Sequence, residues 1–227
     1  MLEEKKELSL NESLNSIIDV EIDTLDNMLN CLSDNEIMEC IPIVKIAAGI
    51  LKIHDSVKEK NKLRQTAEFL KQFKSGTIDC EKLKKMQEKI NKGDKKAKEE
   101  IERIILLLND FKDTFRSAML GNLCRCYVNG TITYNLFYEL TEVIERIQLS
   151  DIHFLKQINE GIIKDTVNWS YVPFNRLKSL GLIDTCPKGL YPIDPDDGYV
   201  RNEEMVSISP TGGHFCVFAL DGINYNE

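Results

Sequence analysis

The sequence predicts a mainly α-helical protein, in which a compact multi-helix array is followed by a small α+β unit at the C-terminus. Apolar residues recur at helical spacing through most of the chain up to about residue 164. Short breaks that contain Gly, Asn or Ser separate these stretches, which is typical of an antiparallel array of helices. From about residue 165 short strand-like runs replace this pattern, and five of the six prolines lie there.

Charge divides the chain into three regions: acidic N-terminal helices over residues 1–36, the helical array over 37–164 and the α+β unit over 165–227. Their formal charges are -8, +5 and -5, which sum to the chain's -8. This polarity could steer a basic partner toward the ends or fold the acidic terminus over the basic middle. A solvated surface of uneven composition is the simpler interpretation.

The first helices are amphipathic and differ in polarity. Residues 1–36 predict one or two acidic helices whose apolar face runs from Leu14 to Leu29. The apolar stretch Ile41–Ile53 predicts a buried core helix that continues to about Phe73, since Pro42 is tolerated in a first helical turn. A helix that lies on a membrane surface or binds a partner is the alternative for this stretch.

Further helices are expected between Gly-containing breaks. Asp79 can cap a helix, Thr133 precedes another, and Ser150 is expected to cap the last helix of the array. The predicted ranges are about 80–91, 94–108, 110–128, 134–147 and 151–163.

The C-terminal unit is predicted to contain a helix, short strands and a final helix. The helix covers about 173–180, and strand candidates lie near 182–185, 189–193 and 204–208. Ser209 followed by Pro210 is typical of an N-cap with proline at the first helical position.

Composition limits the compartment and the chemistry. No apolar run reaches 18 residues, and the charged start lacks the apolar core of a signal peptide, so a cytoplasmic location is expected. The seven cysteines are odd in number and form no Cys-x-x-Cys pair, which favours reduced thiols over disulfides or a zinc site.

No motif for catalysis or cofactor binding is present. The three histidines show no metal-ligand spacing, and the acids of Asp194–Gly198 do not fit the register of a calcium loop. Thr211–His214 contains two glycines but lacks a phosphate-binding frame. We therefore expect no enzyme, no metal and no cofactor, although a site assembled from distant residues would not be visible in the sequence.

The most basic segment is 82–98, with eight lysines against two acids. It could meet phosphate backbones or an anionic surface. Because arginines and aromatic residues are absent from it, a solvated helical surface is the expected interpretation.

One pattern in the C-terminal unit resembles a known family. Leu180-Gly-Leu-Ile183, an acidic loop and then Ile208-Ser-x-x-Gly212 resemble the end of winged-helix repressors of the multiple-antibiotic-resistance type. The resemblance implies a winged-helix-like fold whose helix before Gly-Leu-Ile enters the major groove and whose hairpin touches phosphate.

Carried onto this chain, the resemblance implies nucleic-acid contacts from Arg176, Lys178, Lys188 and Arg201. The acids of the same hairpin would repel DNA. They are Asp194, Asp196, Asp197, Glu203 and Glu204.

A second resemblance covers more of the chain. The Ile41-Pro-Ile-Val44 opening, the Lys-rich middle with Phe69-Leu70 and the closing Gly-Leu-Ile pattern are similar to bacterial proteins of the abortive-infection alpha type. This resemblance implies a role in host–phage conflict.

The acidic hairpin and the lack of catalytic motifs predict a non-catalytic binding or regulatory module that docks a protein partner. The alternatives are a DNA-binding transcriptional regulator and a membrane-surface effector that uses residues 41–53. Homo-oligomers are compatible with each. The sequence leaves the partner and the oligomeric state open, as well as whether the acidic N-terminus packs on the basic middle.

Overall fold

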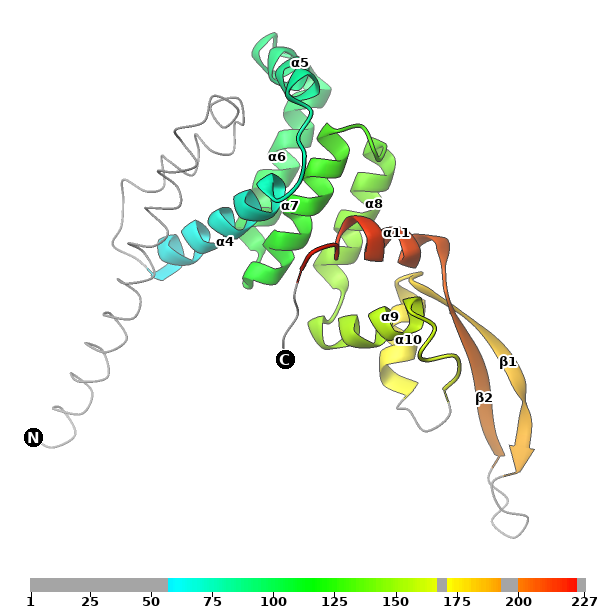
Figure 1. The fold of residues 1–227 in the computed structure, drawn as a ribbon. Helices are drawn as coiled ribbons and strands as arrows, with labels where there is room; N and C mark the ends of the chain where they lie inside the picture. The colour runs from blue at the N-terminus through cyan, green and yellow to red at the C-terminus, as the bar shows by residue number, and fades with distance from the viewer. Residues whose placement is uncertain (1–56, 167–170, 193–199, 224–227) are drawn as a thin grey trace, which may run out of the picture. The chain divides into compact units, whose positions relative to one another are not determined.

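A computed structural model describes residues 57–166, 171–192 and 200–223 (Figure 1). Within these residues the chain is mainly helical, with a small two-stranded antiparallel sheet near the C-terminus, which confirms the predicted fold class. The predicted acidic helices of 1–36 and the apolar stretch 41–53 lie outside the described residues. The chain divides into two compact units, 1–121 and 122–227, and each is described by itself.

The described part of the first unit begins with three helices: α4 (Val57–Lys74), α5 (Cys80–Asn91) and α6 (Lys95–Asp110). As predicted, Asp79 caps α5, and its carboxylate accepts hydrogen bonds from two backbone N–H groups of the first turn. Asp94 does the same for α6 by accepting from the N–H of Ala97 at 2.9 Å. Between these helices Gly93 adopts φ +82, a left-handed conformation that glycine accommodates without strain.

The core of the first unit forms where α7 (Thr114–Val128) approaches α4. Phe69 and Leu70 on α4 are fully buried, and so is Met119 on α7. Gly121 permits the approach, because a Cβ atom there would stand 2.4 Å from the carbonyl oxygen of Phe69. The buried Ser117 hydroxyl also bonds across these helices to the side chain of Gln65.

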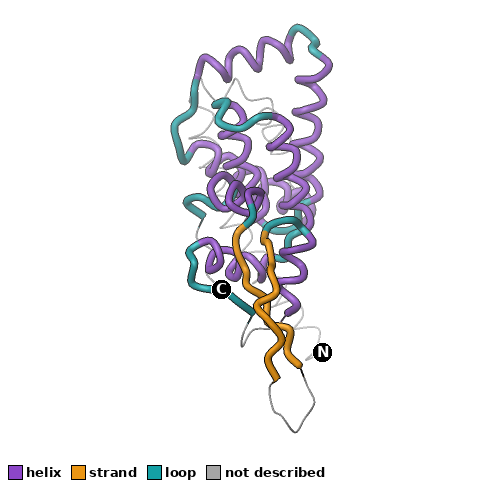
Figure 2. The backbone as a smooth tube through the Cα atoms, turned by 90° about the vertical axis from the view of Figure 1, so that its right-hand side faces the viewer, coloured by secondary structure: helices purple, strands orange, loops and turns teal. Residues whose placement is uncertain are grey.

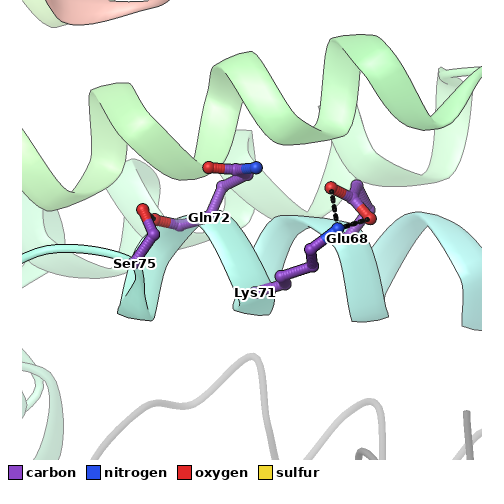
Figure 3. A network of polar contacts seen from close by, with 4 residues as sticks. All are labelled: Glu68, Lys71, Gln72 and Ser75. Atoms are coloured by element: carbon purple, nitrogen blue, oxygen red, sulfur yellow. Dashed lines mark hydrogen bonds and ion pairs between the residues drawn. The ribbon is translucent and has the colours of Figure 1, made fainter. Parts of the chain in front are cut away.

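The exposed side of α4 carries an ordinary surface network (Figure 3). Lys71 pairs with Glu68 at 3.3 Å, one turn away. At the end of the helix the Ser75 hydroxyl donates to the carbonyl oxygen of Gln72 at 2.8 Å. Such exposed pairs contribute little to stability, so the buried face of α4 holds the helix in place.

The second unit contains the end of α7, then α8 (Tyr134–Arg146), a 3-10 turn η1 (Leu149–Asp151), and α9 (Ile152–Asn159). As predicted, Thr133 precedes a helix, and it also caps α8, with its hydroxyl accepting from the N–H of Leu136. The predicted cap at Ser150 is wrong. The chain enters α9 through the 3-10 turn, and no side-chain cap hydrogen bond forms at either start.

The remaining elements are α10 (Tyr171–Ser179), β1 (Ile183–Pro192), β2 (Val200–Ile208) and α11 (Pro210–Phe218). The two strands form an antiparallel hairpin that projects from the helices of this unit (Figure 2). Ser209 caps α11 and Pro210 begins it, as predicted.

The strand prediction needs one correction, because the candidates at 182–185 and 189–193 form one strand. The proline between them, Pro187, is accommodated beside a bulge where the register shifts between Pro187 and Gly189. The sequence also missed a short extension of the sheet. Asp165 forms an isolated bridge to Met205, so the segment before α10 lies along the other side of β2.

The hairpin closes at a backbone junction formed by the recognised sequence pattern. Gly181, with φ +69, ends α10, and its N–H donates to the carbonyl of Lys178. The N–H of Leu182 donates to the carbonyl of Leu177. The N–H of Ser209 donates to the carbonyl of Leu182 at 3.1 Å. Gly212 packs against the same carbonyl, since a Cβ there would stand 1.9 Å from its oxygen.

The junction predicts opposite effects for two adjacent glycines. Gly212→Ala places a methyl group inside contact distance of the Leu182 carbonyl, and overpacking of this kind costs about 1–3 kcal/mol or more. Gly213→Ala meets nothing within 4 Å and gains helix propensity. For a chain of this size we expect Tm to fall by roughly 2–12 °C in the first variant and to hold or rise in the second, by thermal circular dichroism. Equal shifts in the two variants would contradict the close approach.

Candidate functional site

The four predicted nucleic-acid contacts lie on α10 and the hairpin. Arg176 and Lys178 belong to the last turn of α10, Lys188 to β1, and Arg201 to β2 opposite Tyr191. The side chain of Arg201 lies outside the described residues. Each of the other three is bonded within the second unit, and their partners determine what this surface can bind.

Arg176 is bound to a buried carboxylate. Its Nε donates to Oδ2 of Asp151 at 2.6 Å, and its Nη2 donates to Oδ1. The Asp151 side chain is 1% exposed, whereas that of Arg176 is 40% exposed. These bonds raise the pKa of Arg176 above its ordinary value. Because the pair is bidentate and one partner is buried, Arg176 ties α10 to the start of α9, and a phosphate would have to compete with Asp151 for its Nε and Nη2 donors.

The two lysines are also engaged. Lys178 donates to the hydroxyl of Thr185 and lies 4.0 Å from a carboxylate oxygen of Glu204. Lys188 donates to Asp165 at 2.9 Å, which joins β1 to the segment that precedes α10. These are partly exposed contacts and are weaker than the Arg176 pair.

The surface that α10 leaves to solvent combines uncharged residues with the partly exposed bases Arg176 and Lys178. Phe174 and Leu177 are fully buried beneath the helix. The exposed residues Val172, Asn175 and Ser179 follow steps of three and four and therefore share one face. We call these three residues the outer stripe of α10. A helix that reads DNA in the major groove would need its recognition and phosphate contacts here.

The outer face of the hairpin carries sulfur and acidic groups. Cys186 and Met205 are opposite each other in the register, and both are exposed. Asp184 opposite Ser207 continues this face toward the junction. The acids predicted at the hairpin tip, Asp194, Asp196 and Asp197, lie outside the described residues.

Two of the free thiols in the described part of the chain, Cys124 and Cys216, are shielded from solvent to different extents. No group of three or more His, Cys, Asp or Glu residues there could hold a metal ion. Burial raises the pKa of the Cys216 thiol to about 11, and it raises that of Cys124 further. Both thiols are therefore protonated at neutral pH and are poor nucleophiles.

Sequence inspection missed the partners of the predicted bases. Asp151 lies 25 residues before Arg176 in a short turn, and nothing in its local pattern marks it as a buried ion-pair partner. Asp165 likewise reaches Lys188 only because the segment before α10 pairs with β2.

Comparisons with known proteins do not place the chain in a family. No family model matches it, and no curated protein or solved structure is similar to it. The resemblances to winged-helix repressors and to the abortive-infection alpha type stay predictions from the sequence. Among the described helices, none has both the length and the apolar character needed to cross a membrane.

The Arg176–Asp151 pair predicts a stability defect rather than a selective binding defect. Arg176→Gln leaves the buried Asp151 carboxylate without its partner and should cost about 2 kcal/mol, somewhat below the cost for a fully buried pair. Lys178→Gln on the same helix removes only exposed contacts and should change stability by less than about 1 kcal/mol. Urea unfolding of the two variants tests this. Equal midpoints would mean that the pair is not structural.

Proposed function

We propose that this chain is a non-catalytic binding module whose outer stripe of α10 docks a protein partner that carries a basic surface. The observation that supports this proposal most directly is the pairing of Arg176 with the buried Asp151. The pairing occupies two donors of the arginine that the DNA interpretation needs, and the uncharged outer stripe lies on the same helix.

Charge supports a basic protein partner over a nucleic acid. Residues 171–209 contain six acids against four bases. Three of those bases are already bonded within the chain, to Asp151, Thr185 and Asp165. The sequence of this stretch is therefore net acidic, which disfavours phosphate and favours a basic surface.

The hairpin itself is a poor template for strand addition. Pro187 lacks an N–H group, and the adjacent bulge interrupts the regular ladder of β1. Docking through the side chains of α10 fits this unit better than pairing along the edge of β1.

The resemblance of the Ile41–Val44 opening and the Gly-Leu-Ile pattern to the abortive-infection alpha type adds a context, bacterial host–phage conflict. The membrane-surface alternative depends on residues 41–53, which lie outside the described residues. Neither the resemblance nor the membrane-surface alternative adds to the docking mechanism, which depends on α10.

A DNA-binding regulator is the second candidate. It is favoured by the order of elements, because a short helix leads directly into a hairpin through the Leu180–Ile183 pattern. In that mechanism α10 enters the major groove and its bases contact phosphate.

Site-directed photocrosslinking tests the protein-docking proposal. A photoreactive residue replaces Asn175 in the outer stripe of α10, and a matched variant carries it at Asn135, an exposed position on α8. We expect a discrete protein adduct in cells from position 175 alone, with a yield that falls in 0.5 M salt because the complementary charges are screened. The proposal would be contradicted by the same adduct from both positions, or by an adduct that nuclease treatment removes.

Duplex binding by a Lys178→Gln variant separates the two candidates. Because this lysine already bonds to Thr185 and lies near Glu204, we expect its removal to change duplex affinity by less than about twofold. The DNA-regulator mechanism expects a clear loss of affinity and a salt slope about one unit smaller, since a phosphate contact disappears. Fluorescence anisotropy between 50 and 200 mM salt distinguishes these outcomes.

A further inference from the structure

Helix α5 carries four lysines on one face. Lys82, Lys85, Lys89 and Lys92 follow steps of three, four and three residues, so they form one line along the helix surface. We call these four residues the lysine stripe. All are exposed, whereas the opposite side of α5 buries Leu83 against the rest of the first unit.

The surrounding segment strengthens this positive charge. Residues 82–98 hold eight lysines, including those of the stripe, against two acids. One of the acids, Asp94, is occupied by capping α6. The segment therefore keeps a net charge of +6 over α5, the turn at Gly93 and the start of α6.

The lysines of the stripe are available to an external anion. Lys82 and Lys92 form pairs with Asp79 at 3.5 Å and Glu88 at 3.6 Å, and these two lysine side chains are 51% and 78% exposed. Exposed pairs of this kind are worth under about 1 kcal/mol and exchange readily for a phosphate. Lys85 and Lys89, between them, form no ion pair with any residue in the described part of the chain.

We infer that the lysine stripe binds the phosphate backbone of nucleic acid without reading its sequence. The ten steps from Lys82 to the C-cap Lys92 span about 15 Å along the helix, which is close to the length of roughly four successive phosphates on one strand of a duplex. No arginine or aromatic residue lies in 82–98, so bidentate base contacts and base stacking are not available.

An anionic membrane fits this surface less well. Helices that lie on membranes insert an apolar face beside their basic one. The apolar side of α5 is turned into the protein, where Leu83 is 5% exposed. The large apolar side chains exposed in the described part of the chain lie on other elements: Leu106, Tyr138, Ile162, Val172, Met205 and Val217.

The net charge of the whole chain does not by itself decide this contact. At 0.1 M salt the Debye length is about 10 Å, so the potential over the lysine stripe is set by charges near it. The inference goes beyond the proposed function, because it gives the first unit a nucleic-acid surface that is separate from the protein-docking stripe of α10.

The experiment measures binding of the full chain to a fluorescent 25-base-pair duplex of arbitrary sequence between 50 and 200 mM salt. Four phosphate contacts predict a slope of log affinity against log salt of about -3.6. Lys85→Glu/Lys89→Glu should lower affinity at 50 mM at least tenfold and reduce the slope by about 1.8. A second, scrambled duplex should bind equally well.

The matched control is Lys112→Glu/Lys164→Glu, which makes the same change in net charge at two exposed lysines outside 82–98. The duplex affinity of this control should stay within about threefold of that of the unchanged chain. Far-UV circular dichroism spectra should be the same for all three proteins. The inference is overturned if the unchanged chain fails to bind the duplex at 50 mM salt. It is also overturned if the control loses as much duplex affinity as the stripe variant. Binding to vesicles with 30% phosphatidylglycerol but not to the duplex would assign the stripe to a membrane instead.

Discussion

The C-terminal unit depends on one carbonyl group, that of Leu182. It accepts the N–H of Ser209, and the backbone of Gly212 packs directly against it. The Ser209 hydroxyl accepts from the N–H of Gly212 and donates to the carbonyl of Gly181, so the end of α10, both strands and the start of α11 are fixed together. Buried backbone groups must be paired, and here one serine satisfies several of them. A larger residue at position 212 would separate the elements that this junction joins.

This constraint explains why the C-terminal pattern could be recognised in the sequence. Three residues of this pattern act only on their near neighbours in the sequence: Gly181 at a left-handed position, Ser209 as a cap and Pro210 at the first helical position. Their roles can therefore be predicted from the local sequence. The predicted separation of 182–185 from 189–193 was wrong, because the bulge beside Pro187 lets β1 continue.

Long-range pairing could not be read in this way. The Arg176–Asp151 pair joins residues 25 apart, and the bridge from Asp165 to Met205 joins residues 40 apart in the sequence. The sequence shows that the hairpin is acidic and has few bases, but it does not show which of these bases are bonded within the folded chain. The fold class was therefore predictable from periodicity and caps, whereas the chemistry of the candidate site depended on contacts that only the folded chain brings together.

The same distinction separates the bases of α10 from the lysines of α5. Recruiting Arg176 to an external phosphate would gain an exposed contact worth about 0.2–1 kcal/mol. It would leave Asp151, 1% exposed, as an unpaired buried carboxylate at a cost of several kcal/mol. The lysine stripe of α5 faces no such penalty, because its pairs are exposed and two of its members have none in the described residues. A helix followed by a hairpin supplies a shape, but affinity for phosphate requires cations that are free to leave their partners. By that criterion we propose α10 for a protein surface and α5 for a nucleic-acid backbone.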